Sequence, residues 1–208
     1  MAKATTARKK ADPALQRRKT QLAQIREAIE GLKTKLQQRS EASENRGLLQ
    51  SVSLGMYEEI EKLTKKAPAE LVTELVLEQV NDLIGEAKQL MKEDRYVQKL
   101  NQFVPAGDLP ELRDVLFVLR QVRQGLERFD PKVGYVRILL REATIVEGAL
   151  ILYLDGLRSE YLYKELKERF VLSELADIWR QKVGGYGGKA FNFDHLDSID
   201  IQEHFSVT

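Results

Sequence analysis

Residues 13–36, PALQRRKTQLAQIREAIEGLKTKL, decide the fold class of this chain. Asp12 and Pro13 before them are typical of a helix start, as an N-cap and a first-turn proline. The apolar residues then recur seven apart and afterwards alternately three and four apart, at Leu15, Leu22, Ile25, Ile29, Leu32 and Leu36. This spacing is that of a coiled-coil seam. The sequence therefore predicts an amphipathic, coiled-coil-like helix over residues 13–46.

The partner of this helix stays open. Basic residues flank the seam, at Lys19, Arg26, Lys33 and Lys35. Like charges at these positions oppose parallel self-pairing and favour an acidic partner helix, either in the same chain or in another. The alternative is an ordinary amphipathic helix that folds back on its own domain. A homo-oligomer is also compatible with the pattern, because short heptad stretches gain most of their stability by pairing.

Helical periodicity continues along the chain and predicts a helical bundle core over residues 53–183. We expect a helix over 53–66, one from Pro68 to about Leu100, one after a capping pattern at Asp108 and Glu111, and a long one over 132–170. The segment IVEGALILYL, residues 145–154, is apolar nearly all round, which indicates a buried helix. With no block of strand pattern, the predicted fold class is all-α.

Composition limits the compartment and the kind of protein. The 208 residues are 43% hydrophobic and 31% charged, which is enough for a core and for long solvated helix faces. There is no cysteine, so disulfides and thiolate chemistry are excluded, and a reducing cytoplasm is the expected location. The longest apolar segment, 145–154, is too short to cross a membrane, so no membrane association is expected.

The two ends of the chain carry opposite charge. Residues 1–20 hold seven basic residues and one acidic residue, for a charge of +6. Residues 1–12 lack hydrophobic periodicity and are predicted to be a disordered basic arm. Basic side chains neutralise phosphates regardless of sequence, so six residues are candidates for contact with nucleic acid: Arg8, Lys9, Lys10, Arg17, Arg18 and Lys19. The segment has no aromatic residue for base stacking.

The C-terminal end is acidic and aromatic. Residues 190–208 carry four acidic residues and no Lys or Arg, for a charge of −4. They follow the flexible run Gly184–Gly188, so residues 184–208 are predicted to form an extended, glycine-hinged tail. Such a tail docks into a basic, apolar groove, in cis or in trans. The partner-binding candidates are Phe191, Phe193, Asp194, Asp197, Asp200 and Phe205.

Sites for chemistry are weak in this sequence. The only histidines, His195 and His204, match no structural zinc spacing, and no metal or cofactor is predicted. Glu142, Glu147 and Asp155 lie along the predicted buried helix. A buried glutamate must be paired, so we expect Glu147 to meet an arginine of the neighbouring helix, with the donors taken from Arg113, Arg120 and Arg123.

The expected function is therefore that of a non-catalytic helical interaction or assembly protein, an adaptor with protein partners. It would bind them through the basic N-terminal helix and the acidic-aromatic tail. A nucleic-acid-associated accessory protein that contacts phosphates with residues 1–20 is the alternative. An enzyme with a carboxylate site in the bundle is the distant third.

Overall fold

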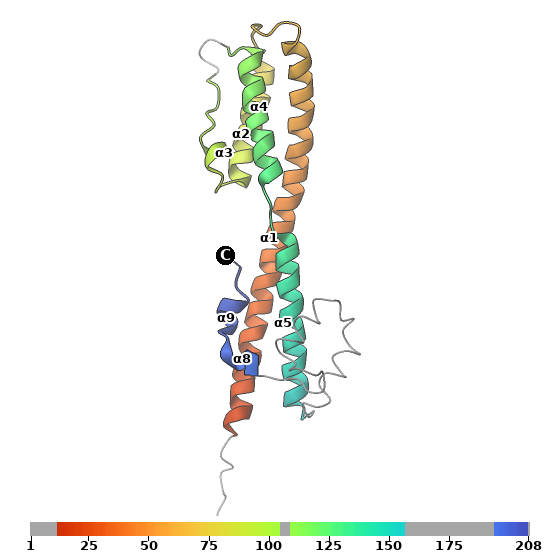
Figure 1. Cartoon of the computed structure of the whole chain (residues 1–208), viewed down its shortest axis with the longest axis vertical. Helices are drawn as coiled ribbons and strands as arrows, with labels where there is room; N and C mark the ends of the chain where they lie inside the picture. The colour runs from red at the N-terminus through yellow and green to blue at the C-terminus, as the bar shows by residue number, and fades with distance from the viewer. Residues whose placement is uncertain (1–11, 105–108, 157–193, 208) are drawn as a thin grey trace, which may run out of the picture. The chain divides into compact units, whose positions relative to one another are not determined.

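The computed structural model describes residues 12–104, 109–156 and 194–207, and within them the chain is helical (Figure 1). Its helices are α1 (Pro13–Thr64), α2 (Glu74–Leu90), α3 (Arg95–Gln98), α4 (Leu112–Arg128), α5 (Val133–Leu154), α8 (Asp194–Ser198) and α9 (Ile201–His204). In this part of the chain the only β pairing is an isolated bridge between Leu71 and Glu111. The predicted all-α class and the long N-terminal helix are confirmed.

The contacts divide the chain into two compact units. Unit 1 combines residues 1–37 with 133–208, and unit 2 is the continuous stretch 38–132. Helix α1 contributes its first part to unit 1 and its remainder to unit 2. Its start is as expected, because the Asp12 carboxylate accepts a hydrogen bond of 3.0 Å from the backbone N–H of Ala14.

The predicted break after residue 46 is wrong, because α1 runs without interruption to Thr64. The polar stretch around Gly47 has few apolar residues, but those it has are used. Leu49 and Ile60 are buried in the core of unit 2. Arg46 and Gln50 donate hydrogen bonds of 2.8 and 3.3 Å to the carbonyl of Leu126, near the C-terminal end of α4. Such tertiary contacts outweigh weak local helix propensity.

The start of α2 also differs from the prediction, at Glu74 rather than Pro68. The preceding residues are held extended against the start of α4. The N–H of Val72 donates to the carbonyl of Pro110 at 3.0 Å, and the N–H of Leu112 donates to the carbonyl of Glu70 at 2.9 Å. Helix α2 then ends at Leu90, short of the expected Leu100, and the short α3 follows.

Two further helix ends differ from expectation. Asp108 lies outside the described residues, and Glu111 is the N-cap residue of α4 but makes no side-chain capping bond. Its carboxylate instead pairs with Nε of Arg113 at 2.7 Å. Helix α5 ends at Leu154, before Gly156, which has a φ of 90°. Glycine adopts this left-handed conformation without strain, so Gly156 is a helix stop that the predicted 132–170 helix overlooked. Residues 157–170 lie outside the described residues.

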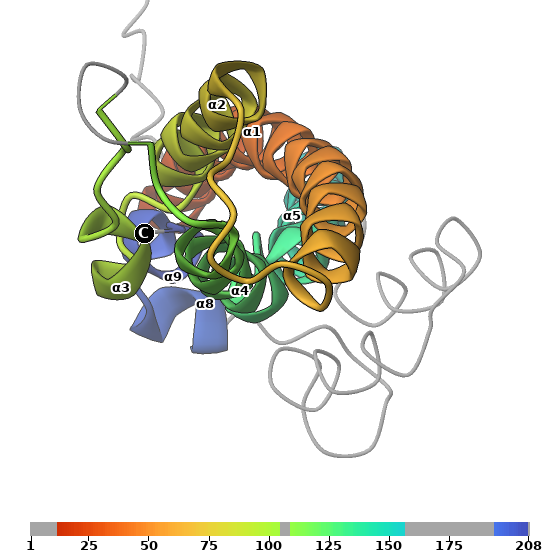
Figure 2. The ribbon, with the colours of Figure 1, turned by 90° about the horizontal axis from the view of Figure 1, so that it is seen from above.

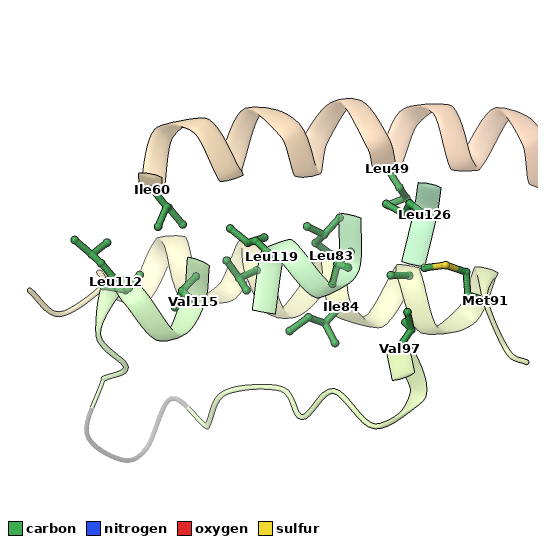
Figure 3. Packing of buried hydrophobic residues seen from close by; sticks show 14 residues of the cluster. Leu49, Ile60, Leu83, Ile84, Met91, Val97, Leu112, Val115, Leu119 and Leu126 are labelled. Atoms are coloured by element: carbon green, nitrogen blue, oxygen red, sulfur yellow. The ribbon is translucent and has the colours of Figure 1, made fainter. Parts of the chain in front are cut away.

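The core of unit 2 forms where α2, α3 and α4 pack on the second part of α1. Figure 1 shows α2 and α4 beside the orange part of α1, and Figure 2 looks down on the same helices from above. Leu49 of α1 points toward Leu126 of α4, and Ile60 lies near Leu112 (Figure 3). At the α3 end of this core, Met91 and Val97 are each 1% exposed. The helical periodicity thus marks the buried faces of α2, with Val80, Leu83 and Ile84, and of α4, with Val115, Leu119 and Val122. The apolar residue Leu75 at the start of α2 is exposed instead.

Gly125 allows the close approach of α3 to α4. A Cβ atom on Gly125 would lie 2.5 Å from Cγ2 of Val97 and 3.4 Å from Sδ of Met91, both buried.

We expect Gly125→Ala to lower the free energy of unfolding by about 1–2 kcal/mol, because overpacking outweighs the gain in helix propensity. Gly31→Ala is the matched control, since nothing lies within 4 Å of that position. It should raise stability by roughly 0.5–1 kcal/mol in urea unfolding followed by circular dichroism. A stabilising Gly125→Ala would contradict the packing described.

Unit 1 has its own core, which joins three parts of the chain. The seam of α1 supplies Ile25, Ile29 and Leu32, and α5 supplies residues such as Val136, Val146 and Leu150. Leu196, Ile201 and Phe205 from the C-terminal segment complete it. The apolar seam of α1 therefore packs within the chain itself. No helix in the described ranges is both long enough and apolar enough to span a membrane.

Candidate functional site

The C-terminal segment, defined here as residues 194–207, is folded rather than extended. It contains the short helices α8 and α9, so the expectation of an extended tail is wrong for these residues. Asp200 caps α9, and its carboxylate accepts from the N–H groups of Gln202 at 2.9 Å and Glu203 at 3.1 Å. The spacing of Asp200 and Glu203 is that of a helix-start pattern, a signal in the sequence that the prediction did not use.

Three apolar side chains hold this segment. Leu196, Ile201 and Phe205 are only 1%, 3% and 2% exposed. They belong to the same buried cluster as the α1 seam and α5. Burying a large apolar side chain contributes roughly 1.5–3 kcal/mol, an upper estimate because an unfolded chain already hides some of this area. In this structure the segment therefore docks on its own chain.

A polar clamp lies beside these anchors. The Asp197 carboxylate receives hydrogen bonds from both terminal nitrogens of Arg18, one of them at 3.0 Å, and from Nε2 of Gln21 at 2.9 Å. Nε of Arg17 lies 3.2 Å from the same carboxylate, and Nη2 of Arg17 donates to the backbone carbonyl of Asp197 at 3.1 Å. We call the surface of α1 and α5 that holds residues 194–207 the C-terminal seat. It combines apolar burial with recognition of a negative charge.

The clamp perturbs the acidity of Asp197. Partial burial acts to raise the pKa of its carboxyl group, but hydrogen bonds from Arg18 and Gln21 and the charges of Arg18 and Arg17 outweigh this, so the pKa lies below its ordinary value. A carboxyl group with a lowered pKa stabilises the docked form at pH values above the unfolded pKa of about 3.9. That contribution is lost as the pH falls through the lower, folded pKa.

The structure brings some of the predicted partner-binding residues together and leaves others aside. Phe205 and Asp197 meet at the C-terminal seat, whereas Asp200 serves as a helix cap. Phe191 and Phe193 lie outside the described residues, as does the glycine run 184–188. Of Asp194, only its place at the start of α8 is described.

The candidates for nucleic-acid contact divide in a similar way. Arg17 and Arg18 both bind Asp197. Lys19 is exposed on α1. Arg8, Lys9 and Lys10 lie outside the described residues. The start of α1 is therefore positive, as the sequence indicated, and part of that charge is used to hold the acidic end of the same chain.

The arginine partner of Glu147 differs from the predicted donors. Nε of Arg26 in α1 lies 2.8 Å from Oε1 of Glu147 in α5, so the glutamate is paired within unit 1. The proposed donors have other partners within unit 2: Arg113 pairs with Glu111, Arg120 donates to the hydroxyl of Tyr57 at 3.1 Å, and Arg123 lies 4.7 Å from the centre of the Tyr57 ring. The expectation of an arginine pair is confirmed, but the choice of helix was wrong, because α5 belongs to unit 1 with the first part of α1, whereas α4 belongs to unit 2.

Gln21 is a site residue that the sequence reasoning missed. It is 6% exposed, accepts a hydrogen bond of 2.7 Å from Arg18 and donates to Asp197. Arg18, Gln21 and Ile25 are spaced three and four apart, so they share one helix face. The sequence therefore contained a signal for this contact, because Arg18 and Gln21 extend the buried face of α1 with polar side chains.

Within residues 12–104, 109–156 and 194–207 there is no group of three or more histidine, cysteine, aspartate or glutamate residues that could hold a metal ion. Comparison of the chain with protein-family models, with curated proteins and with solved structures finds no match.

Proposed function

We propose that this chain is a non-catalytic helical interaction and assembly protein, whose C-terminal seat binds the acidic, apolar C-terminal segment of a second copy as well as its own. The observation that carries the proposal is the composition of the seat: Arg17, Arg18 and Gln21 gather on one carboxylate beside three buried apolar anchors. This is recognition of a peptide segment by charge and by shape together. The reducing cytoplasm is the proposed location, in keeping with a cysteine-free sequence.

A second copy is the occupant best supported by chemistry. Its segment is identical to the one already seated, so it fits without any change, and exchange of identical elements between copies is a low-cost route to dimers. The segment within the chain competes at an effective concentration on the order of millimolar. Exchange is therefore expected where the protein is concentrated. In a dimer with both segments exchanged, each docked segment raises the effective concentration of the other at its seat.

The polar clamp determines which segment the seat accepts, but it contributes only a small part of the binding free energy. The Arg17 and Asp197 side chains are 54% and 23% exposed, so such pairs contribute only about 0.2–1 kcal/mol each. Placing like charges opposite each other costs far more, several kcal/mol. Charge reversal is therefore the sharpest way to control which segment enters which seat.

A complementation experiment with two full-length variants tests the proposal. Arg18→Asp spoils the seat and leaves the segment intact, whereas Asp197→Arg spoils the segment and leaves the seat intact. Each variant alone should lose its docking in cis and gain none in trans. When the two are mixed, one intact seat receives one intact segment, and the two altered surfaces carry opposite charges. We expect a 1:1 heterodimer by analytical ultracentrifugation.

The controls keep the outcome decisive. The double variant Arg18→Asp/Asp197→Arg in one chain should dock in cis again and remain a monomer under the same conditions. Circular dichroism establishes that each chain is helical. If the mixture stays monomeric while the double variant recovers protection of residues 194–207 in hydrogen exchange, the seat takes only its own segment and the assembly role is refuted. The nucleic-acid role stays a prediction, since Arg17 and Arg18 are engaged with Asp197.

A further inference from the structure

Unit 2 carries an apolar groove that has no part in the C-terminal seat. We call it the leucine groove: a hollow of about 230 Å³ between the end of α1, the connection before α2 and the start of α4. Its floor includes Ile60, Val72 and Leu112, which are 3%, 3% and 4% exposed. Ile60 and Leu112 lie at one end of the unit 2 core in Figure 3. The groove is therefore an open continuation of that core.

Large apolar side chains remain in solvent at the groove. Leu63 and Leu71 line it and are 47% and 56% exposed. Val76 and Gln79, from the first turns of α2, also line the groove. Scattered single leucines on a surface are ordinary, but a cluster around a hollow marks an interaction site.

The walls of the groove are fixed before any partner arrives. The bridge that joins Leu71 and Glu111 ties the connection to α4, through backbone hydrogen bonds of 2.9 and 3.0 Å. Thr73 then caps α2 through a 3.5 Å bond from the N–H of Val76. A preformed surface loses less conformational entropy on binding than a mobile one.

Size and charge together define the occupant. Pockets for small molecules commonly hold roughly 300–1,000 Å³, so this hollow suits one or two side chains of a docked helix better than an enclosed ligand. The charged residues that line it are Glu59 and Glu70, both acidic. Within the described part of the chain, neither carboxylate takes part in a salt bridge. A basic partner would therefore find two unpaired negative charges beside an apolar hollow.

We propose that the leucine groove binds a short amphipathic helix of a partner protein that carries Lys or Arg beside its apolar anchors. The anchors enter the hollow over Ile60, Val72 and Leu112, and the basic side chains meet Glu59 and Glu70. Helix-in-groove recognition works through such anchors at i, i+3 or i+4 and i+7, with complementary charge at the edge. An acidic edge repels nucleic acid and anionic lipid surfaces.

A pair of labelled peptides tests the proposal on the full-length chain. One consists of two repeats of Leu-Lys-Lys-Leu-Leu-Lys-Leu, and the other has glutamate in place of every lysine. We expect the basic peptide to bind at least about tenfold more tightly by fluorescence anisotropy at low salt. Leu63→Ser/Leu71→Ser should weaken its binding about tenfold, because the anchors lose apolar contact. Glu59→Lys/Glu70→Lys should reverse the preference between the two peptides.

Matched variants separate the groove from the general surface. Leu48 is 67% exposed and does not line the groove, so Leu48→Ser should leave the affinity unchanged within about twofold. Glu44→Lys/Glu86→Lys makes the same change of charge elsewhere on unit 2 and should alter binding less than about threefold at moderate salt. Equal binding of both peptides, or equal losses in the matched variants, would overturn the proposal.

Self-association is the remaining outcome that would overturn it. If Leu63→Ser/Leu71→Ser abolishes a dimer of the peptide-free chain while Leu48→Ser does not, the occupant is a second copy rather than a basic helix. Arg18 and Asp197 are unaltered in all these variants, so the result is independent of segment exchange at the C-terminal seat.

Discussion

Replacing Leu119 with alanine is expected to lower the free energy of unfolding of unit 2 by about 3–5 kcal/mol. Leu119 lies in the middle of α4, is 0% exposed, and points into the cluster drawn in Figure 3. Its removal takes away the transfer free energy of a leucine and leaves a cavity that rigid helices close only in part. Urea unfolding followed by circular dichroism measures the loss.

Phe117→Ala is the matched control on the same helix. Phe117 is 62% exposed, so its truncation should change stability by less than about 1 kcal/mol. Because the chain has two units, its unfolding need not be a single transition, and hydrogen exchange of α2 and α4 assigns the effect to unit 2. Equal effects of Leu119→Ala and Phe117→Ala would show that α4 does not bury the face described.

Replacing Phe205 with alanine is expected to release the C-terminal segment from its seat. Phe205 is 2% exposed in the core of unit 1, and truncation of a buried phenylalanine costs about 3–5 kcal/mol. The segment is held by only three such anchors and a partly exposed clamp, so a loss of this size detaches it. Hydrogen exchange of residues 201–207 should become faster by two orders of magnitude or more, since 1.4 kcal/mol corresponds to about a tenfold change.

Ser206→Ala supplies the comparison for this prediction. Ser206 is exposed, and its hydroxyl group donates only to the nearby carbonyl of Glu203 at 2.9 Å. Exchange in that variant should match the wild-type chain within a few-fold, and α4 should be protected equally in both variants. Wild-type protection of residues 201–207 in Phe205→Ala would mean that Phe205 is not an anchor.

Periodicity in the sequence predicted the fold class and the buried faces, because those depend on residues close together in the chain. Leu119 and Val122 follow such a pattern, and so does the α1 seam at Ile25 and Ile29. Helix ends were less predictable. Helix α1 continues past Gly47 because Arg46 reaches a carbonyl that lies 80 positions further on, and no local pattern reports such a contact. The late start of α2 has a similar cause, in backbone bonds to Pro110 and Leu112.

The sequence showed which residue types form the candidate site but not which of them contact each other. The basic start of α1 and the acidic and apolar residues of the C-terminal segment were evident from composition. That Arg18 meets Asp197 depends on α1 and α5 forming one unit with residues from the end of the chain. The same long-range arrangement gave Glu147 a partner in Arg26 instead of an arginine of α4. The leucine groove was not foreseen, because its leucines belong to three different segments.

The division of the chain into two units affects how it folds during synthesis on the ribosome. Unit 2 is one unbroken stretch, so it can complete its core while later residues are still being translated. Unit 1 cannot do so, because Ile25 and Leu32 must wait for α5 and then for Phe205. Until α5 and the C-terminal segment have been translated, which takes seconds, the apolar seam of α1 stays exposed to solvent. The risk that nascent chains associate with one another through this exposed seam therefore begins early in synthesis. It ends only when the C-terminal segment has emerged from the ribosome.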